Sequence, residues 1–374
     1  MAALATQNAR TPSGATVHDV ARVAGVSAMT VSRVINGRDN VSDATRGRVN
    51  AALEALKYQP NLAARAARTG TLRIGLLYSN PSAAFLSEFL VGAMDQCSQS
   101  GCQLILERCD DLRSQRAAID KLIAAGSDGI LVPPPLCDSK SALKRLNDIG
   151  MPSVAVATAR PVAGVAAVRI DDYQGALAMT RYLIGLGHRD IAFIKGDPKH
   201  TPALLRHQAF QDAMQAAGLK LPPGRIAQGY FTYRSGLDAA RQLLAQAPRP
   251  SAIFASNDDM AAAVIAVAHG LQLQVPADLT VCGFDDTPVA TTVWPELTTI
   301  HQPIAGMARA AVNLVVDDIR RRRAGEPRVA EHQLLEFTLL ARESSAAPHE
   351  PSLSMRHERL DANPVAGGAG APSG

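Results

Sequence analysis

Two patterns of hydrophobic and polar positions divide the chain of 374 residues. Between residues 16 and 56, apolar residues recur at the spacing of three and four that is typical of short amphipathic helices. From Leu72 onward, short runs rich in β-branched residues alternate with longer amphipathic stretches, and these runs start near residues 72, 102, 128, 152, 166, 190, 225, 251 and 279. Such alternation predicts parallel sheets with helices on both faces, so the expected fold class is α/β behind a small helical module.

The helical module begins with two helices joined by a tight turn. Thr16 and Asp19 form a start like a capping box, Gly25 tolerates the backbone that ends a first helix, and Ser27 can cap a second. A third helix, capped by Ser42, completes a shared apolar seam. The seam comprises Val20, Val23, Ala24, Val31, Val34, Ile35, Val49, Leu53 and Leu56. This spacing predicts a helix-turn-helix.

The second helix keeps one face outside the seam, and its residues are Ala28, Met29, Ser32, Arg33 and Asn36. In a helix-turn-helix, this face lies in the major groove of DNA. Arg33 can bind both acceptors of guanine, and Ala28 and Met29 can contact thymine methyl groups. The alternative is a solvated helix with a chance arginine, but the caps, turn, seam and charge all favour a DNA reader.

The distribution of charge along the chain also indicates DNA as the partner. The first 70 residues hold nine basic and four acidic side chains, whereas the remainder holds 29 basic and 30 acidic ones. The net charge of +4 therefore comes from the first fifth of the chain, which suits a polyanion. Five cysteines without a CxxC pair fit a reducing cytoplasm. Neither a signal peptide nor a membrane helix is expected.

Polar residues follow the strand-like runs of the body. Two sets of runs predict two α/β subdomains with a cleft, where ligands bind beyond the carboxyl ends of strands. Asn257 and Asp285 follow two of these runs, Arg206 opens a helix after another, and Phe231 ends a fourth. Together, these groups suit a polyhydroxy ligand. For Asn257 alone, capping of the following helix is an equal alternative.

The run from Thr16 to Leu77 resembles the N-terminus of the lactose-repressor (LacI) family of bacterial transcription regulators, in VSAMTVSRVIN, in the VS before the third helix and in YQPN. The resemblance covers roughly residues 16–343. It implies a body with the doubly wound, two-subdomain fold of periplasmic binding proteins. It further implies a homodimer on pseudo-palindromic double-stranded operator DNA. The implied operator-contacting residues are Thr16, Ser27, Ala28, Met29, Ser32, Arg33 and Asn36.

By the same resemblance, Tyr58 and Asn61 begin a hinge helix that enters the minor groove. Family members usually place a leucine wedge where this chain has Ala67, and alanine is too short to separate bases in the same way. Either the chain kinks DNA less, or Arg65 and Arg68 add attraction to the DNA backbone in compensation. A plain linker is the alternative reading of this segment.

The resemblance also assigns an effector site for a small sugar. Arg206, Asn257 and Asp285 match sugar-contacting positions, and Phe85 and Phe231 match aromatic walls. Trp294 is expected in the core, with lining of the cleft as the alternative. Surface solvation is favoured over binding of an acidic sugar or a metal for four neighbouring basic side chains, Lys195, Lys199, His200 and His207.

The expected organisation has five parts: a disordered extension (1–15), the helix-turn-helix domain (16–60), the hinge helix (61–71), the effector and dimerisation domain (72–343) and a disordered tail (344–374). The tail has no leucine heptads, so a dimer is expected rather than a tetramer. No cofactor is expected.

Two other classes of protein are weighed against a cytoplasmic, sugar-controlled repressor of carbohydrate genes. A periplasmic sugar-binding protein is disfavoured by the basic module and the missing signal peptide. An enzyme is disfavoured because no phosphate-binding loop or nucleophile motif is present.

Overall fold

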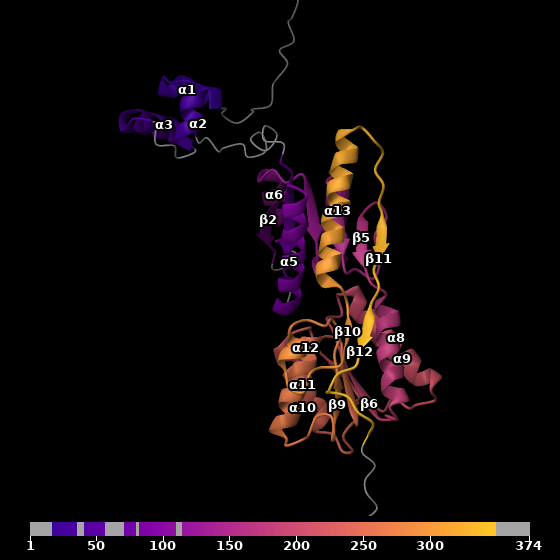
Figure 1. Cartoon of the computed structure of the whole chain (residues 1–374). Helices are drawn as coiled ribbons and strands as arrows, with labels where there is room; N and C mark the ends of the chain where they lie inside the picture. Colours follow the sequence, from indigo (N-terminus) through magenta and orange to yellow (C-terminus); the bar gives the residue numbers. More distant parts are fainter. Residues whose placement is uncertain (1–16, 36–40, 57–70, 80–81, 110–113, 349–374) are drawn as a thin grey trace, which may run out of the picture. The chain divides into compact units, whose positions relative to one another are not determined.

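The computed structural model describes residues 17–35, 41–56, 71–79, 82–109 and 114–348. The chain forms two compact units whose boundary falls between Gly70 and Thr71, and each is described on its own (Figure 1). The expected N-terminal extension and almost the whole expected hinge helix lie outside the described residues.

The first unit consists of three short helices, α1 (Val17–Ala24), α2 (Ala28–Ile35) and α3 (Asp43–Ala55). Gly25 has a φ of +63° and turns the chain between α1 and α2, as the sequence predicted. The buried seam comprises Val20, Ala21, Ala24, Val31, Val34, Val49 and Ala52. The prediction for Val23 was wrong, because this side chain is 53% exposed. At 3.6 residues per turn it is rotated about 100° from the centre of the face formed by Val20, Ala21 and Ala24.

The second unit begins with a lobe built on a six-stranded parallel sheet in the order β11-β5-β4-β3-β1-β2. Its strands are β1 (Arg73–Tyr78), β2 (Gln103–Arg108), β3 (Gly129–Val132), β4 (Ser153–Val156), β5 (Ala166–Arg169) and β11 (His332–Leu334). Helices α5 (Ala83–Gln99) and α13 (Ile304–Arg323) pack on one face, and α6 (Gln115–Ala124) and α7 (Lys140–Asp148) pack on the other. A short 3-10 turn, η1 (Leu136–Asp138), precedes α7. We call this the first lobe.

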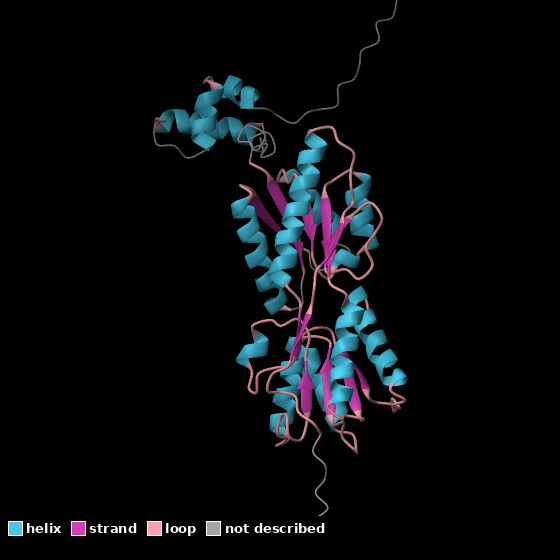
Figure 2. Cartoon of the chain, turned by 45° about the vertical axis from the view of Figure 1, so that its right-hand side comes forward, coloured by secondary structure: helices cyan, strands magenta, loops and turns pink. Residues whose placement is uncertain are grey.

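The second lobe holds a four-stranded parallel sheet in the order β7-β6-β8-β9. Its strands are β6 (Ile191–Lys195), β7 (Ile226–Gln228), β8 (Ala252–Ala255) and β9 (Thr280–Cys282). Helices α8 (Asp172–Gly185) and α9 (Thr201–Ala216) cover one face, α10 (Tyr233–Leu244) and α11 (Asp258–Gly270) cover the other, and α12 (Val289–Thr292) follows β9. Figure 2 shows both sheets enclosed by helices, so the α/β prediction is confirmed.

The chain passes between the lobes three times: from β5 into α8, from β10 (Thr299–His301) into α13, and from β11 into β12 (Thr338–Leu340). Strands β10 and β12 form an antiparallel pair beside these crossings. The sequence predicted β1 to β9 but missed β10, β11 and β12. Strands β7 and β9 are equally short but belong to the regular alternation of strand and helix, whereas β10 follows a helix of only four residues and no helix separates β11 from β12.

Two expectations about the body were wrong. The expected disordered tail was to begin at residue 344, but Ser344 is fully buried. Its Oγ donates to the Val281 carbonyl at 2.6 Å and accepts from the Thr298 amide at 2.8 Å. Trp294, expected in the core, is 73% exposed. It stands in the loop after α12, where Ala290 and Leu297 fill the core instead.

Contact between α5 and α13 depends on Gly92. A Cβ at this position would lie 2.2 Å from the Ala305 carbonyl oxygen. We expect Gly92→Ala to lower the free energy of unfolding by about 1–3 kcal/mol, because the helices would have to separate. Gly185→Ala is the matched control, since Gly185 lies on α8 with no atom near its Cβ position. It should be neutral or stabilising by up to about 1 kcal/mol. Equal losses in denaturant titrations of both variants would contradict this account.

Candidate functional site

The outer face of α2 carries the exposed residues expected of a DNA reader. Ser27 caps the helix by accepting a hydrogen bond from the Thr30 amide at 3.2 Å, as predicted. Met29 is 65% exposed, and the exposed Arg33 guanidinium lies 3.6 Å from the Met29 sulfur. Ala28 begins the helix and is half-buried.

The other predicted DNA contacts belong to parts of the chain that the structure does not describe. Ser32 lies on α2, but its side chain is outside the described set. The rest lie wholly outside the described residues: Thr16, Asn36, Tyr58, Asn61, Arg65 and Ala67.

A cavity of about 480 Å³ lies between the two lobes, beyond the carboxyl ends of their strands. All five residues predicted for the effector site line it: Phe85, Arg206, Phe231, Asn257 and Asp285. They come from regions that follow β1, β6, β7, β8 and β9. The sequence did not predict the other lining residues, which are Ser82, Pro134, Pro135, Ala157, Asp197, His200 and Gln302.

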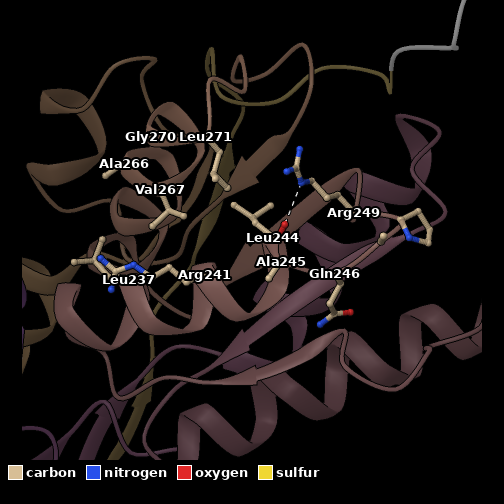
Figure 3. A pocket seen from close by; sticks show the side chains of 12 residues that line it. Leu237, Arg241, Leu244, Ala245, Gln246, Arg249, Ala266, Val267, Gly270 and Leu271 are labelled. Atoms are coloured by element: carbon tan, nitrogen blue, oxygen red, sulfur yellow. Dashed lines mark hydrogen bonds between the residues drawn. The ribbon is translucent and has the colours of Figure 1, made fainter.

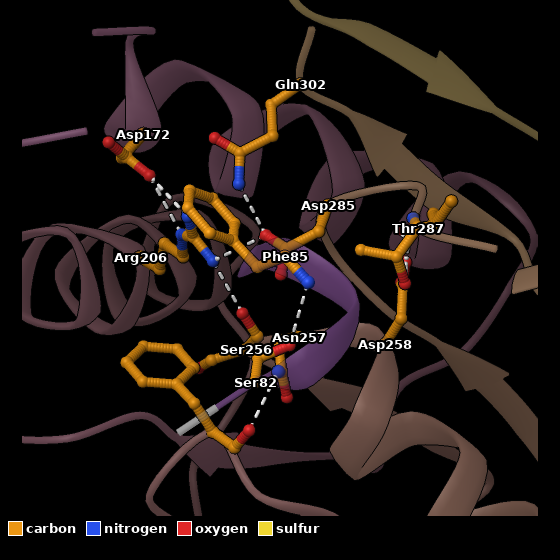
Figure 4. A network of polar contacts seen from close by, with 12 residues as sticks. Ser82, Phe85, Asp172, Arg206, Ser256, Asn257, Asp258, Asp285, Thr287 and Gln302 are labelled. Carbon is orange, nitrogen blue, oxygen red and sulfur yellow. Dashed lines mark hydrogen bonds and ion pairs between the residues drawn. The ribbon is translucent and has the colours of Figure 1, made fainter. Parts of the chain in front are cut away.

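Arg206 is the centre of a buried polar network (Figure 4). Its Nε and Nη2 donate to one carboxylate oxygen of Asp172 at 2.9 and 2.7 Å. Its Nη1 donates to the Ser256 carbonyl at 2.6 Å and reaches Asp285 at 3.5 Å. The guanidinium carbon lies 3.5 Å from the centroid of the Phe284 ring, in cation–π geometry. The arginine lies in the second turn of α9, because the helix starts at Thr201 rather than at Arg206.

Asp285 has an unusual protonation equilibrium. Burial raises its pKa to about 7, although the Arg206 charge and a hydrogen bond from Gln302 act in the opposite direction. Gln302 Nε2 donates to Asp285 Oδ1 at 2.6 Å. The carboxyl group can therefore change protonation state near neutral pH.

Asn257 serves as a helix cap and also lines the cavity. Its Oδ1 accepts from the Met260 amide at 3.1 Å and caps α11, whereas its Nδ2 donates to the Phe231 carbonyl at 3.1 Å. Phe231 is held at a φ of +61°, and a Cβ at Gly196 would lie 2.0 Å from its ring. Gly196 therefore provides the space that the aromatic wall needs.

Left-handed backbone conformations gather around the cavity. Ala157, Phe231 and Asp285 have φ values of 55°, 61° and 115°, and Asp286 follows at 56°. Such conformations are costly for residues with a Cβ and are found mainly where function requires them.

Two pairs of side chains join the lobes at the edge of the cavity, and we call them the latches. In the first, Ser82 Oγ donates to Asp259 Oδ2 at 2.6 Å. In the second, Asp138 Oδ2 lies 2.6 Å from His200 Nδ1 and accepts from the Thr201 amide at 2.8 Å. The hydrogen bonds from His200 and Thr201 outweigh the effect of burial, which acts in the opposite direction, and lower the pKa of Asp138.

The second latch includes a group with metal-ligand chemistry. Among the described residues, Cys137, Asp138 and His200 offer ligand atoms within 4.8 Å of one another. However, the Asp138 oxygens already accept from His200 Nδ1, the Thr201 amide and two threonine hydroxyls, Thr158 and Thr201. Burial also raises the pKa of the Cys137 thiol, which disfavours the thiolate that metals need. The geometry fits a latch better than a metal site.

Surface solvation was expected for four neighbouring basic side chains, Lys195, Lys199, His200 and His207, and this was wrong for the two histidines. His200 is buried, and His207 is half-buried with its ring stacked on Phe193 at 5.7 Å. Lys199 is exposed, as expected. Asp138, Asp172 and Gln302 were missed, because each meets its partner through a contact distant in sequence. The only available signal was their place at the end of a strand or the start of a helix.

A second, larger hollow of about 1420 Å³ lies on the outer side of α10 and α11 (Figure 3). Its walls are mostly aliphatic, with Leu237, Leu244 and Leu271 among them, and Arg249 Nε donates to the Leu244 carbonyl at 3.0 Å. It lies away from the carboxyl ends of the strands. We therefore assign the candidate ligand site to the cavity between the lobes.

No helix in the described part of the chain combines the length and the apolar character needed to cross a membrane.

The raised pKa of Asp285 generates a prediction about stability. The unfolded carboxyl ionises near its ordinary pKa of 3.8, whereas the folded one stays protonated up to about pH 7. Wild type should therefore lose stability relative to Asp285→Asn as the pH rises from about 4 to about 7, and the difference should be constant above that range. Melting temperatures of both proteins between pH 4.5 and 8 test this, with Asp238→Asn on exposed α10 as the control. A difference that does not change with pH would contradict the assignment.

Two families of known proteins match parts of this chain. Residues 16–61 match the family described as bacterial regulatory proteins, lacI family, and residues 180–345 match the periplasmic binding protein-like domain. The ribose operon repressor of Escherichia coli (strain K12) is 36% identical over 312 residues, which cover 82% of this chain and 93% of the relative. The HTH-type transcriptional repressor PurR of Escherichia fergusonii is 35% identical over 329 residues, covering 86% and 95%.

Solved structures give the same result. A transcriptional regulator, CelR, in complex with cellobiose is 33% identical, with a TM-score of 0.67 over 88% of this chain and 100% of the other. The lac repressor dimer bound to operator and the anti-inducer ONPF is 27% identical, with a TM-score of 0.67 over 90% and 100%. On these grounds, the chain belongs to the LacI family of bacterial regulatory proteins.

Proposed function

We propose that this chain is a DNA-binding repressor of carbohydrate-utilisation genes, controlled by a small sugar. The observation that carries the proposal is that one chain combines an exposed recognition face on α2 with a polar and aromatic cavity between two lobes. Names of relatives point the same way, since they include a ribose operon repressor and a regulator complexed with cellobiose. Reading DNA requires the protein to act in the cytoplasm.

The DNA-binding part of the proposal concerns α2 and the hinge. Arg33, Met29, Ala28, Ser32 and Asn36 read bases in the major groove. Ser27 and Thr16 position the helix, and the segment containing Tyr58, Asn61, Arg65 and Ala67 enters the minor groove. A dimer, as in the operator-bound lac repressor, would read both halves of a pseudo-palindromic operator.

Effector control acts through the cavity. Arg206, Asn257 and Asp285 bind the hydroxyl groups of the sugar, and Phe85 and Phe231 cover its apolar faces. A ligand held between the lobes favours one lobe arrangement over another, which shifts the population of dimers able to bind DNA.

We propose no catalytic role. Asp258, the buried acid beside the cavity, accepts from the Thr287 amide at 2.8 Å and from the Thr299 hydroxyl at 2.7 Å. Burial and the neighbouring Asp285 raise its pKa, which favours the neutral form. These hydrogen bonds give Asp258 a structural role, which is to hold the loop that carries Asp285, and leave it no catalytic one. Turnover of any sugar by the purified protein would contradict this point.

Fluorescence anisotropy on the DNA upstream of its own gene tests the proposed function. We expect tight, salt-sensitive binding that one sugar changes. Equal affinity for random DNA would overturn it.

Arg33→Ala should cost about 1–3 kcal/mol of operator binding and relax the preference at one base position, because a bidentate contact is lost. The measurement is affinity for the operator and for its single-base variants. Arg22→Ala, which removes an exposed arginine from α1, is the control and should keep the discrimination. An unchanged ratio of matched to mismatched affinity in Arg33→Ala would refute base reading.

Ala67→Leu should increase operator bending, because a larger apolar side chain can wedge between base steps. A gel phasing assay compares the bend angle with that of wild type and of Ala67→Ser, a small control. Identical angles for all three would count against a minor-groove role for this position.

A further inference from the structure

We propose that the cavity takes a neutral, hydroxyl-rich ligand with a single ring and rejects sugars that carry a phosphate or carboxylate. The inference rests on the proposed function, because it concerns the effector of the same cavity. Five groups of observations carry it: the charges on the wall, the hydrogen bonds of Arg206, the capping of the helix N-termini, an acceptor without a donor, and the size of the cavity.

The charged groups on the wall are predominantly acidic. Among the lining residues, Asp197 and Asp285 carry carboxyl groups, and Arg206 is the permanent cation. Lys195 ends β6 and Lys199 directly precedes His200, but neither is among the residues that line the cavity. A bound anion would therefore be repelled by the Asp197 carboxylate, and by Asp285 as well once that carboxyl group ionises near pH 7.

The positive charge of Arg206 is already compensated within the protein. Its guanidinium pairs with Asp172 and Asp285, donates to the Ser256 carbonyl and lies over the Phe284 ring. Sites for phosphate or carboxylate usually offer an arginine with a free pair of donors. Here, a fork of that kind points at Asp172, since both Nε and Nη2 donate to it.

Helix N-termini are the other common anion sites, and those beside the cavity are occupied by the chain itself. At α9, the Thr201 amide donates to the Asp138 carboxylate at 2.8 Å. At α5, the Phe85 amide donates to Ser82 Oγ at 3.2 Å, and at α11 the Met260 amide donates to Asn257 at 3.1 Å. An incoming phosphate would have to displace these caps.

The cavity instead has an acceptor without a donor. Gln302 is 3% exposed, and its Oε1 has no hydrogen-bond partner among the described residues. Its Nε2 is committed to Asp285, which fixes the orientation of the amide. A buried acceptor without a donor is costly, and a hydroxyl group of the ligand would satisfy it, which favours a hydroxyl-rich ligand.

Cavity size limits the ligand. The volume of about 480 Å³ includes the open space at the mouth, so the enclosed space between the lobes is much smaller. The Ser82–Asp259 and Asp138–His200 latches join the lobes at its edge, and each spans 2.6 Å. We therefore expect room for at most one ring between the lobes, because a second ring would require a latch to open.

Calorimetric titration of the full-length protein tests the proposal. The probes are four neutral monosaccharides (D-ribose, D-xylose, D-glucose and D-galactose), the phosphate ester of each at its terminal hydroxyl group, the disaccharide cellobiose, and the base hypoxanthine. We expect one neutral monosaccharide to bind and its phosphate ester to bind at least about ten-fold more weakly. A phosphate ester that binds equally well or better, tighter binding of cellobiose or hypoxanthine, or no binding of any neutral monosaccharide would overturn the proposal.

Two variants test the stated causes. Asp197→Asn should reduce the discrimination against phosphate at least about three-fold, whereas Asp238→Asn removes the same charge from exposed α10 and should leave the discrimination unchanged. Gln302→Met, which keeps the volume but removes the acceptor together with the hydrogen bond to Asp285, should weaken binding of the neutral sugar at least about ten-fold. Wild-type discrimination in Asp197→Asn, or wild-type affinity in Gln302→Met, would overturn the corresponding argument; thermal melts confirm that each variant is folded.

Operator binding without any sugar, measured on the same preparations, distinguishes failure of this inference from failure of the proposed function. If the protein prefers its operator and responds to a phosphate ester, the inference fails while the proposed function stands. If it shows no preference for operator DNA, the proposed function itself fails.

Discussion

The body of the protein depends on burying one guanidinium group. Arg206 is 4% exposed, and a charge removed from water is tolerated only when oppositely charged and polar partners surround it. Asp172 supplies one partner from the start of α8, and Asp285 supplies another from the loop after β9. Three segments that are far apart in sequence must therefore meet at one point, and the second lobe is arranged around that meeting.

The same network lies where the chain passes between the lobes. Asp172 directly follows the crossing from β5, and Gln302 directly follows β10 before the crossing into α13. A group that binds Arg206 or Asp285 thus acts on atoms bonded to two of the three connections. Under the proposed function, the link between ligand and lobe arrangement would be short and would consist of hydrogen bonds rather than a long chain of packed residues.

Most strands and part of the cavity wall could be predicted from the sequence, because their signals are local. Strand periods and strand-end residues are local signals, so β1 to β9 were predicted, as were Arg206, Phe231, Asn257 and Asp285, whereas Phe85 was assigned through the family resemblance alone. All five residues lie on the cavity wall. Pairings distant in sequence leave no local signal. Asp138 meets His200 across 62 positions, and nothing near either residue indicates the other. The prediction that Trp294 is buried was wrong because large apolar side chains lie in the core on average, whereas the burial of any one of them depends on the space around it.

Left-handed backbone at Ala157, Phe231 and Asp285 has a consequence for how this cavity can evolve. Branched side chains such as valine or isoleucine are excluded at those positions by their own backbones, whatever the ligand. New ligand preferences must therefore arise at wall positions with ordinary backbone, such as Ser82, Phe85 and His200. Relatives with different effectors should vary most at these ordinary positions, while the left-handed ones form an unchanging frame.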